Sequence, residues 1–147
     1  LLNRQGLRHW VASQSAEEPV VLGMVDLDHF KQINDLHGHG MGDQVIRHLA
    51  RLLQACGSEH CRAARLGGEE FVVVALGSGR GPDLRQMLER LRQQFADTAP
   101  QPGATLSAGL ALGSVGEFEA TLREADAALY RAKQAGRNRV EAAFSAI

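Results

Sequence analysis

The stretch Arg65-Leu66-Gly67-Gly68-Glu69-Glu70-Phe71 decides the fold of this chain. Strand-like residues 61–66 lead into its two glycines, and the apolar run of residues 71–76 leads away. Gly-Gly supplies the positive φ angles that two-residue hairpin turns need, so the stretch predicts a β-hairpin with two carboxylates beside a turn without side chains. A bulky, charged ligand could approach that backbone closely. Taken alone, the stretch is also explained by a hairpin with a solvated acidic end.

Length and composition indicate one globular domain over residues 1–147, with 44% apolar and 22% charged residues. The formal net charge of −1 leaves no electrostatic footprint for nucleic acid, so we expect no nucleic-acid partner. No apolar run has the length of a membrane span, no signal peptide is visible, and the two cysteines lack metal-site or disulfide-framework spacing. We therefore expect a cytoplasmic domain. Because the chain begins with Leu1 inside a running segment, we also expect it to be excised from a longer protein.

The order of the expected elements predicts the fold class. Helical periodicity marks residues 3–15, 29–36, 83–96, 118–133 and a long helix from residue 43, whereas strand patterns mark residues 20–25, 61–66, 71–76, 104–113 and 139–144. Without its additions the order is βαββαβ, which predicts an α/β (α+β) fold with a ferredoxin-like core and its helices on one face of the sheet. The glycine-punctuated residues 37–43 are expected to form a loop.

A second acidic group ends the first expected strand, where the apolar run stops at Asp26-Leu27-Asp28. Residues two apart on a strand share a face, so both carboxylates would point the same way, either to hold a hard cation or to cap the next helix. The strand end and the central hairpin can lie side by side in such a sheet. Asp26 and Asp28 would then face Glu69 and Glu70. Four converging acids repel one another unless cations are bound, and oxygen ligands favour Mg²⁺ or Mn²⁺.

Basic residues near these acids suit a nucleoside triphosphate. Lys31, one helical turn beyond the acidic pair, could neutralise phosphate charge. Lys133 and Arg137, expected one turn apart on the last helix, could grip a terminal phosphate. His37 and His39 have no evident third ligand, so they are better explained as hydrogen-bonding groups than as a transition-metal site.

Three signatures make the chain resemble the GGDEF family of diguanylate cyclases. Residues 26–43 look like its first signature, residues 65–71 are similar to its defining loop in the Glu-Glu form, and residues 125–138 resemble its closing signature. Leu2-Asn3-Arg4 looks like the tail of its opening motif. The match spans nearly the whole chain in the right order.

The resemblance implies a nucleotide-cyclase fold related to the palm of polymerases. It implies Mg-dependent condensation of two GTP molecules into cyclic di-GMP with release of pyrophosphate, at the interface of two protomers. We therefore expect a homodimer, and an upstream sensory domain in the parent protein. A downstream phosphodiesterase domain and membrane attachment of the parent stay open.

The resemblance also implies roles for single residues. The expected metal ligands are Asp26, the Leu27 carbonyl and Glu69, with Glu70 close by. Glu69 is implied as the base for the ribose 3′-hydroxyl, and Lys31 as a group that stabilises charge in the transition state. The residues implied to contact the substrate are Asn34, His39 and Asp43.

Asp43 gives a physical reason for guanine. One carboxylate can accept both adjacent N–H donors of the guanine Watson–Crick edge, and Asn34 can satisfy the remaining groups. Adenine cannot match that edge, which disfavours a cyclase for another nucleotide. The main alternative is a catalytically silent, GTP-binding domain that regulates an attached domain. The intact Asp26, Lys31 and Glu-Glu loop argue against it.

One stretch departs from the family pattern. Many members carry an Arg-x-x-Asp product-inhibition site, and the equivalent residues here are Ser58-Glu59-His60-Cys61. Neither the guanidinium nor the carboxylate stands at its position. We therefore expect this domain to lack the usual high-affinity feedback site.

Overall fold

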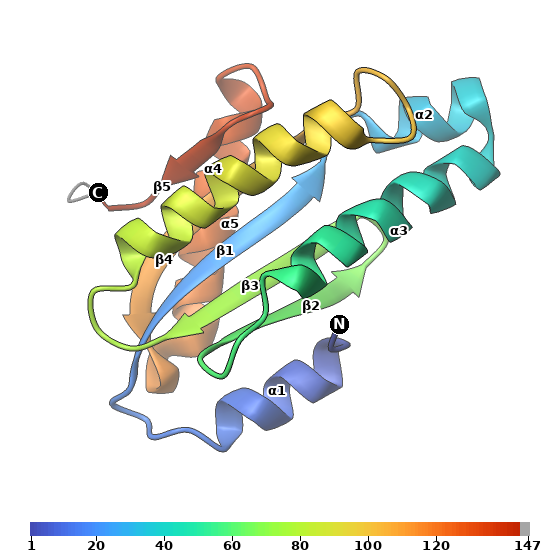
Figure 1. Cartoon of the computed structure of the whole chain (residues 1–147). Helices are drawn as coiled ribbons and strands as arrows, with labels where there is room; N and C mark the ends of the chain where they lie inside the picture. The colour runs from blue at the N-terminus through green and yellow to red at the C-terminus, as the bar shows by residue number, and fades with distance from the viewer. Residues whose placement is uncertain (145–147) are drawn as a thin grey trace.

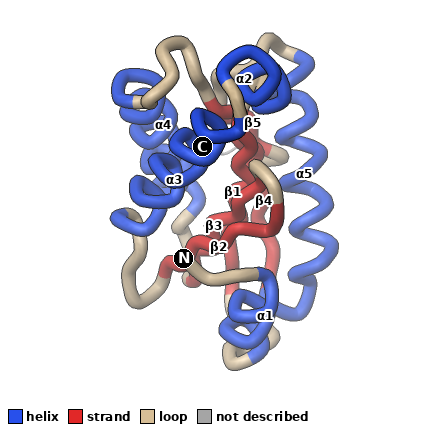
Figure 2. The backbone as a smooth tube through the Cα atoms, turned by 90° about the vertical axis from the view of Figure 1, so that its right-hand side faces the viewer, coloured by secondary structure: helices blue, strands red, loops and turns tan. Residues whose placement is uncertain are grey.

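The computed structural model describes residues 1–144, in which one five-stranded sheet carries helices on both faces (Figures 1 and 2). The helices are α1 (Arg4–Ala12), α2 (Phe30–His37), α3 (His39–Ala55), α4 (Gly81–Thr98) and α5 (Phe118–Gln134). The strands are β1 (Pro19–Leu27), β2 (Cys61–Gly67), β3 (Glu70–Leu76), β4 (Leu106–Ser114) and β5 (Val140–Ala142). Among these residues every helix is too short or too polar to span a bilayer.

The strand order is β2-β3-β1-β4-β5, with antiparallel pairing except between β4 and β5. The four strands of the predicted βαββαβ core therefore lie in the ferredoxin-like order, and the mixed α/β fold is confirmed. The predicted hairpin is β2–β3, and β3 pairs directly with β1 in a register that sets Asp26 opposite Glu70. The expected juxtaposition of the first strand's end and the hairpin is thus present.

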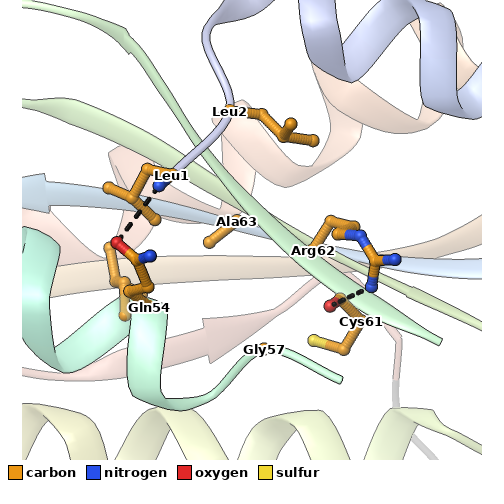
Figure 3. A pocket seen from close by; sticks show the side chains of 8 residues that line it. Leu1, Leu2, Gln54, Gly57, Cys61, Arg62 and Ala63 are labelled. Atoms are coloured by element: carbon orange, nitrogen blue, oxygen red, sulfur yellow. Dashed lines mark hydrogen bonds between the residues drawn. The ribbon is translucent and has the colours of Figure 1, made fainter. Parts of the chain in front are cut away.

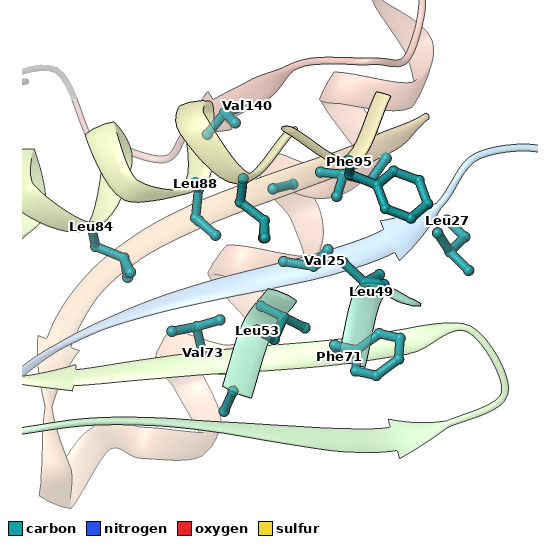
Figure 4. Close-up of a cluster of buried hydrophobic side chains, with 14 of the residues drawn as sticks. Val25, Leu27, Leu49, Leu53, Phe71, Val73, Leu84, Leu88, Phe95 and Val140 are labelled. Carbon is teal, nitrogen blue, oxygen red and sulfur yellow. The ribbon is translucent and has the colours of Figure 1, made fainter. Parts of the chain in front are cut away.

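Both faces of the sheet are buried, so the prediction that helices pack on one face only was wrong. Helices α3 and α4 cover one face, as Figure 2 shows, and α1 and α5 cover the other. Along β1, Val21 and Val25 face the first layer, where Figure 4 shows Val25 among side chains of α3 and α4, whereas Leu22 and Met24 face the second. A continuous apolar strand needs cover on both faces. The added helices α1 and α5 supply the second layer.

Two boundaries near the predicted site also differ from expectation. Residues 37–43 are not a loop, because α2 continues to His37 and α3 begins at His39. Gly38, with φ of 86°, makes the break between the two helices. At the other end of the chain, α5 stops at Gln134, so Arg137 lies beyond the helix rather than one helical turn after Lys133.

Candidate active site

The end of β1 and the β2–β3 turn form the acidic part of the site. The Leu27 N–H donates to the Glu69 carbonyl oxygen at 3.4 Å, which ties the strand to the turn. Arg65 closes the turn with Nε and Nη2 donating to the Gly68 carbonyl oxygen at 3.0 and 2.7 Å. This turn leaves Glu69 half-buried and Glu70 exposed. The two glutamates are therefore held beside β1 by backbone contacts, while their side chains keep access to solvent.

Asp26 is the buried centre of this acidic group. It is 6% exposed and faces α5, where Lys133 Nζ donates to its Oδ2 in an ion pair. Its second oxygen, Oδ1, is buried without a hydrogen-bond partner among the described residues. Burial raises the pKa of Asp26, and the charges of Glu69 and Glu70 add to the rise, although Lys133 opposes it. A buried carboxylate with one unsatisfied oxygen is ready to accept a cation.

A cavity of about 230 Å³ opens next to Asp26. Its lining residues are Asp26, Glu70, Asp126, Leu129, Tyr130 and Lys133. The sequence-based prediction gives Asp126 and Tyr130 no role of their own in the site, and Tyr130 is 64% exposed. Their spacing from Lys133, at seven and three residues on one helix, was the signal that could have placed them beside it.

Asp28 does not join the acidic group, although the sequence placed it with Asp26. β1 ends at Leu27, and His29 takes a left-handed φ of 55°, so the alternation of a strand no longer applies at Asp28. The Asp28 carboxylate turns to β4, where it accepts hydrogen bonds from Thr105 Oγ1 at 2.8 Å and Ser107 Oγ at 2.7 Å. Three acids rather than four are thus left for a cation.

The oxygen ligands near Asp26 suit a divalent cation, because Asp26 Oδ1 has no hydrogen-bond partner among the described residues and Glu69 and Glu70 lie close to it. All available ligands are oxygens, which suits Mg²⁺ or Mn²⁺. As the side chains stand, no group of three or more His, Cys, Asp or Glu among residues 1–144 is positioned to hold a metal ion. The exposed Glu70 and half-buried Glu69 would therefore have to turn toward Asp26 to complete the ligand set.

The predicted base-binding residues lie on α2 and at the start of α3. Asn34 is half-buried on α2, whereas Asp43 and His39 are exposed on the first turns of α3. Lys31 is exposed on the first turn of α2. The close packing of the two helices puts Asn34 against the backbone of Gly42, next to Asp43. Asn34 thus lies close to the residue that precedes Asp43 in the chain.

Gly42→Ala is expected to weaken GTP binding about tenfold or more. A Cβ at Gly42 would overlap Asn34 Oδ1 and lie 3.3 Å from Phe30 Cζ, so Asn34 must leave its position. Loss of one good hydrogen-bonding group to a polar ligand commonly has an effect of this size. Equilibrium titration with a fluorescent GTP analogue measures it. Gly40→Ala is the matched control, because a Cβ there meets nothing within 4 Å. Equal affinities for the two variants would contradict the role of Asn34.

The two basic residues assigned to phosphate occupy different environments. Lys133, in the last turn of α5, is paired with Asp26. Arg137 follows Gly136, whose φ of 123° ends the helix, and Arg137 itself has a left-handed φ of 63°. Its guanidinium makes no hydrogen bond or ion pair within the described part of the chain. Within the described residues the Arg137 side chain is therefore unpaired, whereas Lys133 is engaged by Asp26.

The fold and this site define a nucleotide-binding enzyme domain with the palm-like architecture of nucleotide cyclases. A family model described as diguanylate cyclase, GGDEF domain, matches residues 1–139. The chain belongs to the GGDEF family of diguanylate cyclase domains, as the sequence motifs predicted. The predicted enzyme class is confirmed with it.

Relatives and solved structures agree with this assignment. Diguanylate cyclase DgcP from Pseudomonas aeruginosa is 43% identical over 135 residues, which are 84% of this chain and 19% of that protein. The GGDEF domain of DgcB from Caulobacter crescentus, solved in complex with cyclic di-GMP, matches with a TM-score of 0.88 and 34% identity, covering 99% of this chain and 90% of that one. The active GGEEF domain of a diguanylate cyclase from Vibrio cholerae has a TM-score of 0.83 and 33% identity, covering 99% of each chain. The chain spans between 18% and 40% of the length of curated relatives that it matches.

Residues 58–61, where we expect the feedback site of the family to be missing, lie between α3 and the start of β2, away from the acidic group. It borders a hollow of about 250 Å³ that Figure 3 shows, with Arg62 and Cys61 on one side and Gln54 and Leu1 on the other. The Arg62 guanidinium donates to the Ser58 and Cys61 carbonyl oxygens and lies 5.1 Å from the centre of the Trp10 ring. The arginine beside this loop is thus already used in contacts within the fold.

We expect the isolated domain not to bind cyclic di-GMP tightly at residues 58–61. The loop offers a ligand no free guanidinium, because that of Arg62 is engaged, and phosphate recognition without arginine loses its bidentate contact. Calorimetric titration of the domain with cyclic di-GMP checks this. Tight binding that disappears when residues 58–61 are replaced by alanines would show that the expectation is wrong.

Proposed function

We propose that this domain is an active diguanylate cyclase that condenses two GTP molecules into cyclic di-GMP and two pyrophosphates. The observation that carries the proposal is Asp26, a buried carboxylate with one unsatisfied oxygen, next to the Glu69-Glu70 turn. An acidic group in this state suits a divalent cation and a triphosphate. Membership of the GGDEF family supports GTP as the nucleotide.

The residues of the chain divide the chemistry among them. Glu69 accepts the proton of a ribose 3′-hydroxyl, whose oxygen then attacks the α-phosphorus of the other GTP, and pyrophosphate leaves. Lys31 stabilises the charge that develops on the phosphoryl oxygens. Asn34 and Asp43 hold the guanine edge, and His39 contacts the substrate from the start of α3. Arg137 and the released Lys133 bind the terminal phosphates.

A divalent cation, Mg²⁺ or Mn²⁺, would be held by Asp26, the Leu27 carbonyl oxygen and Glu69, with Glu70 close by. When bound, it neutralises triphosphate charge and polarises the phosphoryl group. The Asp26–Lys133 ion pair keeps the buried carboxylate compensated before the cation and substrate arrive. When the cation replaces Lys133 as the partner of Asp26, the lysine is free to bind the phosphates. One exchange of partners thus readies Asp26 for the metal and Lys133 for the nucleotide.

Two protomers are needed, because each holds one GTP and ring closure forms two phosphodiester bonds between two nucleotides. The site is open at the hairpin turn, where Gly67 and Gly68 would meet nothing within 4 Å if they carried a Cβ. A second copy of the domain can approach there. We further propose that the domain is one part of a longer protein whose upstream sensory region brings two copies together. The greater length of the curated relatives supports this arrangement.

The test is incubation of the domain at high concentration with GTP and Mg²⁺, or Mn²⁺, followed by chromatography of the nucleotides. We expect cyclic di-GMP from the parent domain and at least about a hundredfold less from Glu69→Gln, since the base and one metal ligand are lost together. Glu59→Gln, at an exposed glutamate that precedes β2 at the end opposite the turn, is the matched control. If the domain stays silent even when fused to a dimerising helix, but still binds GTP, the proposal fails in favour of a regulatory GTP-binding domain.

A further inference from the structure

Asp28 joins three parts of the fold that meet behind the site. It is 2% exposed, and besides its contacts with Thr105 and Ser107 its Oδ2 accepts the backbone N–H of Asn138 at 3.0 Å. Its own N–H donates to the Thr105 carbonyl oxygen at 2.9 Å. The end of β1, the start of β4 and the turn after α5 are therefore fixed to one carboxylate.

The turn that Asp28 holds has an unfavourable backbone. Arg137 and Asn138 are consecutive non-glycine residues with φ of 63° and 49°. Such left-handed residues persist only where surrounding contacts hold them. The Asn138 N–H is shared between Asp28 Oδ2 and Ser107 Oγ, the latter at 3.1 Å, and Asn138 Oδ1 accepts from Arg92 Nη1 of α4 at 2.9 Å. These contacts fix the direction in which the Arg137 side chain leaves the backbone.

We propose that Asp28 is a positioning residue that holds the Gly136–Asn138 turn so that Arg137 reaches the terminal phosphates of the nucleotide. Asp28 follows Asp26 by two residues. The end of β1 therefore fixes the position of the turn that carries Arg137 relative to the buried Asp26 carboxylate. A role as metal ligand is disfavoured, because both Asp28 oxygens already accept hydrogen bonds, whereas Asp26 Oδ1 accepts none. The inference rests on the proposed function for its ligand, a guanine nucleoside triphosphate.

The test compares two ligands that differ in their terminal phosphates, the non-reacting α,β-methylene analogue of GTP and GMP. Calorimetry of the domain with Mg²⁺ measures both affinities. We expect Asp28→Ala to weaken the triphosphate analogue about tenfold to a hundredfold, the range for loss of a hydrogen bond to a charged group, and to change GMP binding far less. Arg137→Ala should give the same pattern. Because Asp28 acts through Arg137, the double variant should bind the analogue no more weakly than Arg137→Ala alone.

Two further variants keep the test decisive if Asp28→Ala does not fold. Ser107→Ala removes a side chain that accepts the Asn138 N–H, whereas Thr105→Val removes a donor to the same Asp28 oxygen without touching the turn. Only Ser107→Ala should lower the affinity for the analogue selectively. Asp28→Asn, which keeps the shape and one oxygen acceptor, should recover part of the binding lost in Asp28→Ala.

Several results would overturn the proposal. Additive effects of Asp28→Ala and Arg137→Ala, or equal losses for the analogue and GMP, would mean that Asp28 acts on stability or on another part of the site. Equal losses of affinity for the analogue in Ser107→Ala and Thr105→Val would also mean that the effect does not pass through the turn. Because no turnover is needed, a domain without cyclase activity can still show the expected pattern. A parent domain that does not bind the analogue would overturn both proposals together.

Discussion

Gly109→Ala is expected to destabilise the domain strongly, and to lower its stability more than Gly23→Ala, which adds a methyl group to the neighbouring strand β1. Gly109 lies on β4 directly under α5, and a Cβ there would overlap the Leu129 nitrogen and the Ala125 carbonyl oxygen and lie 2.8 Å from the Ala128 carbonyl carbon. These are backbone atoms, so relief requires movement of the whole helix. Overpacking of a core commonly costs about 1–3 kcal/mol, and contacts with backbone belong at the upper end or beyond. A loss of that size should lower the Tm by about 10 °C in a domain of this length.

Thermal unfolding followed by circular dichroism measures the effect, and Gly23→Ala is its control. Gly23 pairs with Leu110 from its place in β1, and its added Cβ would lie 2.7 Å from Leu88 Cδ1, the flexible end of a side chain on the opposite face. That side chain can adjust, so we expect a clearly smaller loss. Similar Tm values for the two variants would contradict the view that α5 sits on β4 without room for a methyl group. Because α5 carries Lys133, folded Gly109→Ala should also bind GTP more weakly.

The central hairpin and its partner strand could be predicted because their signals are local. The two glycines predict a tight turn and the apolar runs on each side predict buried strands, so β2, β3 and β1 follow from residues that touch one another. The turn itself lies one residue later than predicted, at Gly68 and Glu69, because Gly67 still pairs with Glu70. The placement of Asp26 beside the Glu69-Glu70 turn then follows from the sheet order of a βαββαβ chain. The family resemblance uses the turn and the end of β1 as well, together with the signature at residues 125–138 on the last helix.

The errors arose where a tertiary contact overrides a local pattern. Gly40 and Gly42 indicate a loop by their composition, yet both lie in α3. A glycine is needed at position 42 because Asn34 fills the space that a Cβ there would take. The apolar stripe of α5 showed which residues are buried but not which face of the sheet buries them. The sequence pattern places Asp28 with Asp26 only if the strand continues, whereas β1 ends between them at Leu27. Arg137 was assigned to a helix that stops at Gln134.

Asp26→Asn is expected to lower cyclase activity strongly and, at neutral pH, to raise the stability of the domain. The pKa of Asp26 is raised in the folded state by burial first and by Glu69 and Glu70 next, so these effects outweigh the pairing with Lys133. Folding therefore favours the protonated form, and the parent domain loses stability as pH rises from the ordinary Asp value of 3.8 through the raised pKa. Asparagine carries no charge at any pH and escapes that loss. Lys133, with 29% of its side chain exposed, can be solvated when its partner is removed.

The stability difference between Asp26→Asn and the parent should thus be largest at neutral pH and vanish below pH 3.8, where Asp26 is protonated in both folded and unfolded chains. Urea unfolding across this range measures it, with Glu59→Gln as the control that removes an exposed carboxylate. Added Mg²⁺ or Mn²⁺ should raise the Tm of the parent but not that of Asp26→Asn, because only the parent binds the cation through Asp26. Activity should fall about a hundredfold or more, since the polarising cation loses its buried ligand. A variant less stable than the parent at neutral pH would instead mean that the ion pair with Lys133 outweighs the burial of charge, and that Asp26 serves the fold as much as the site.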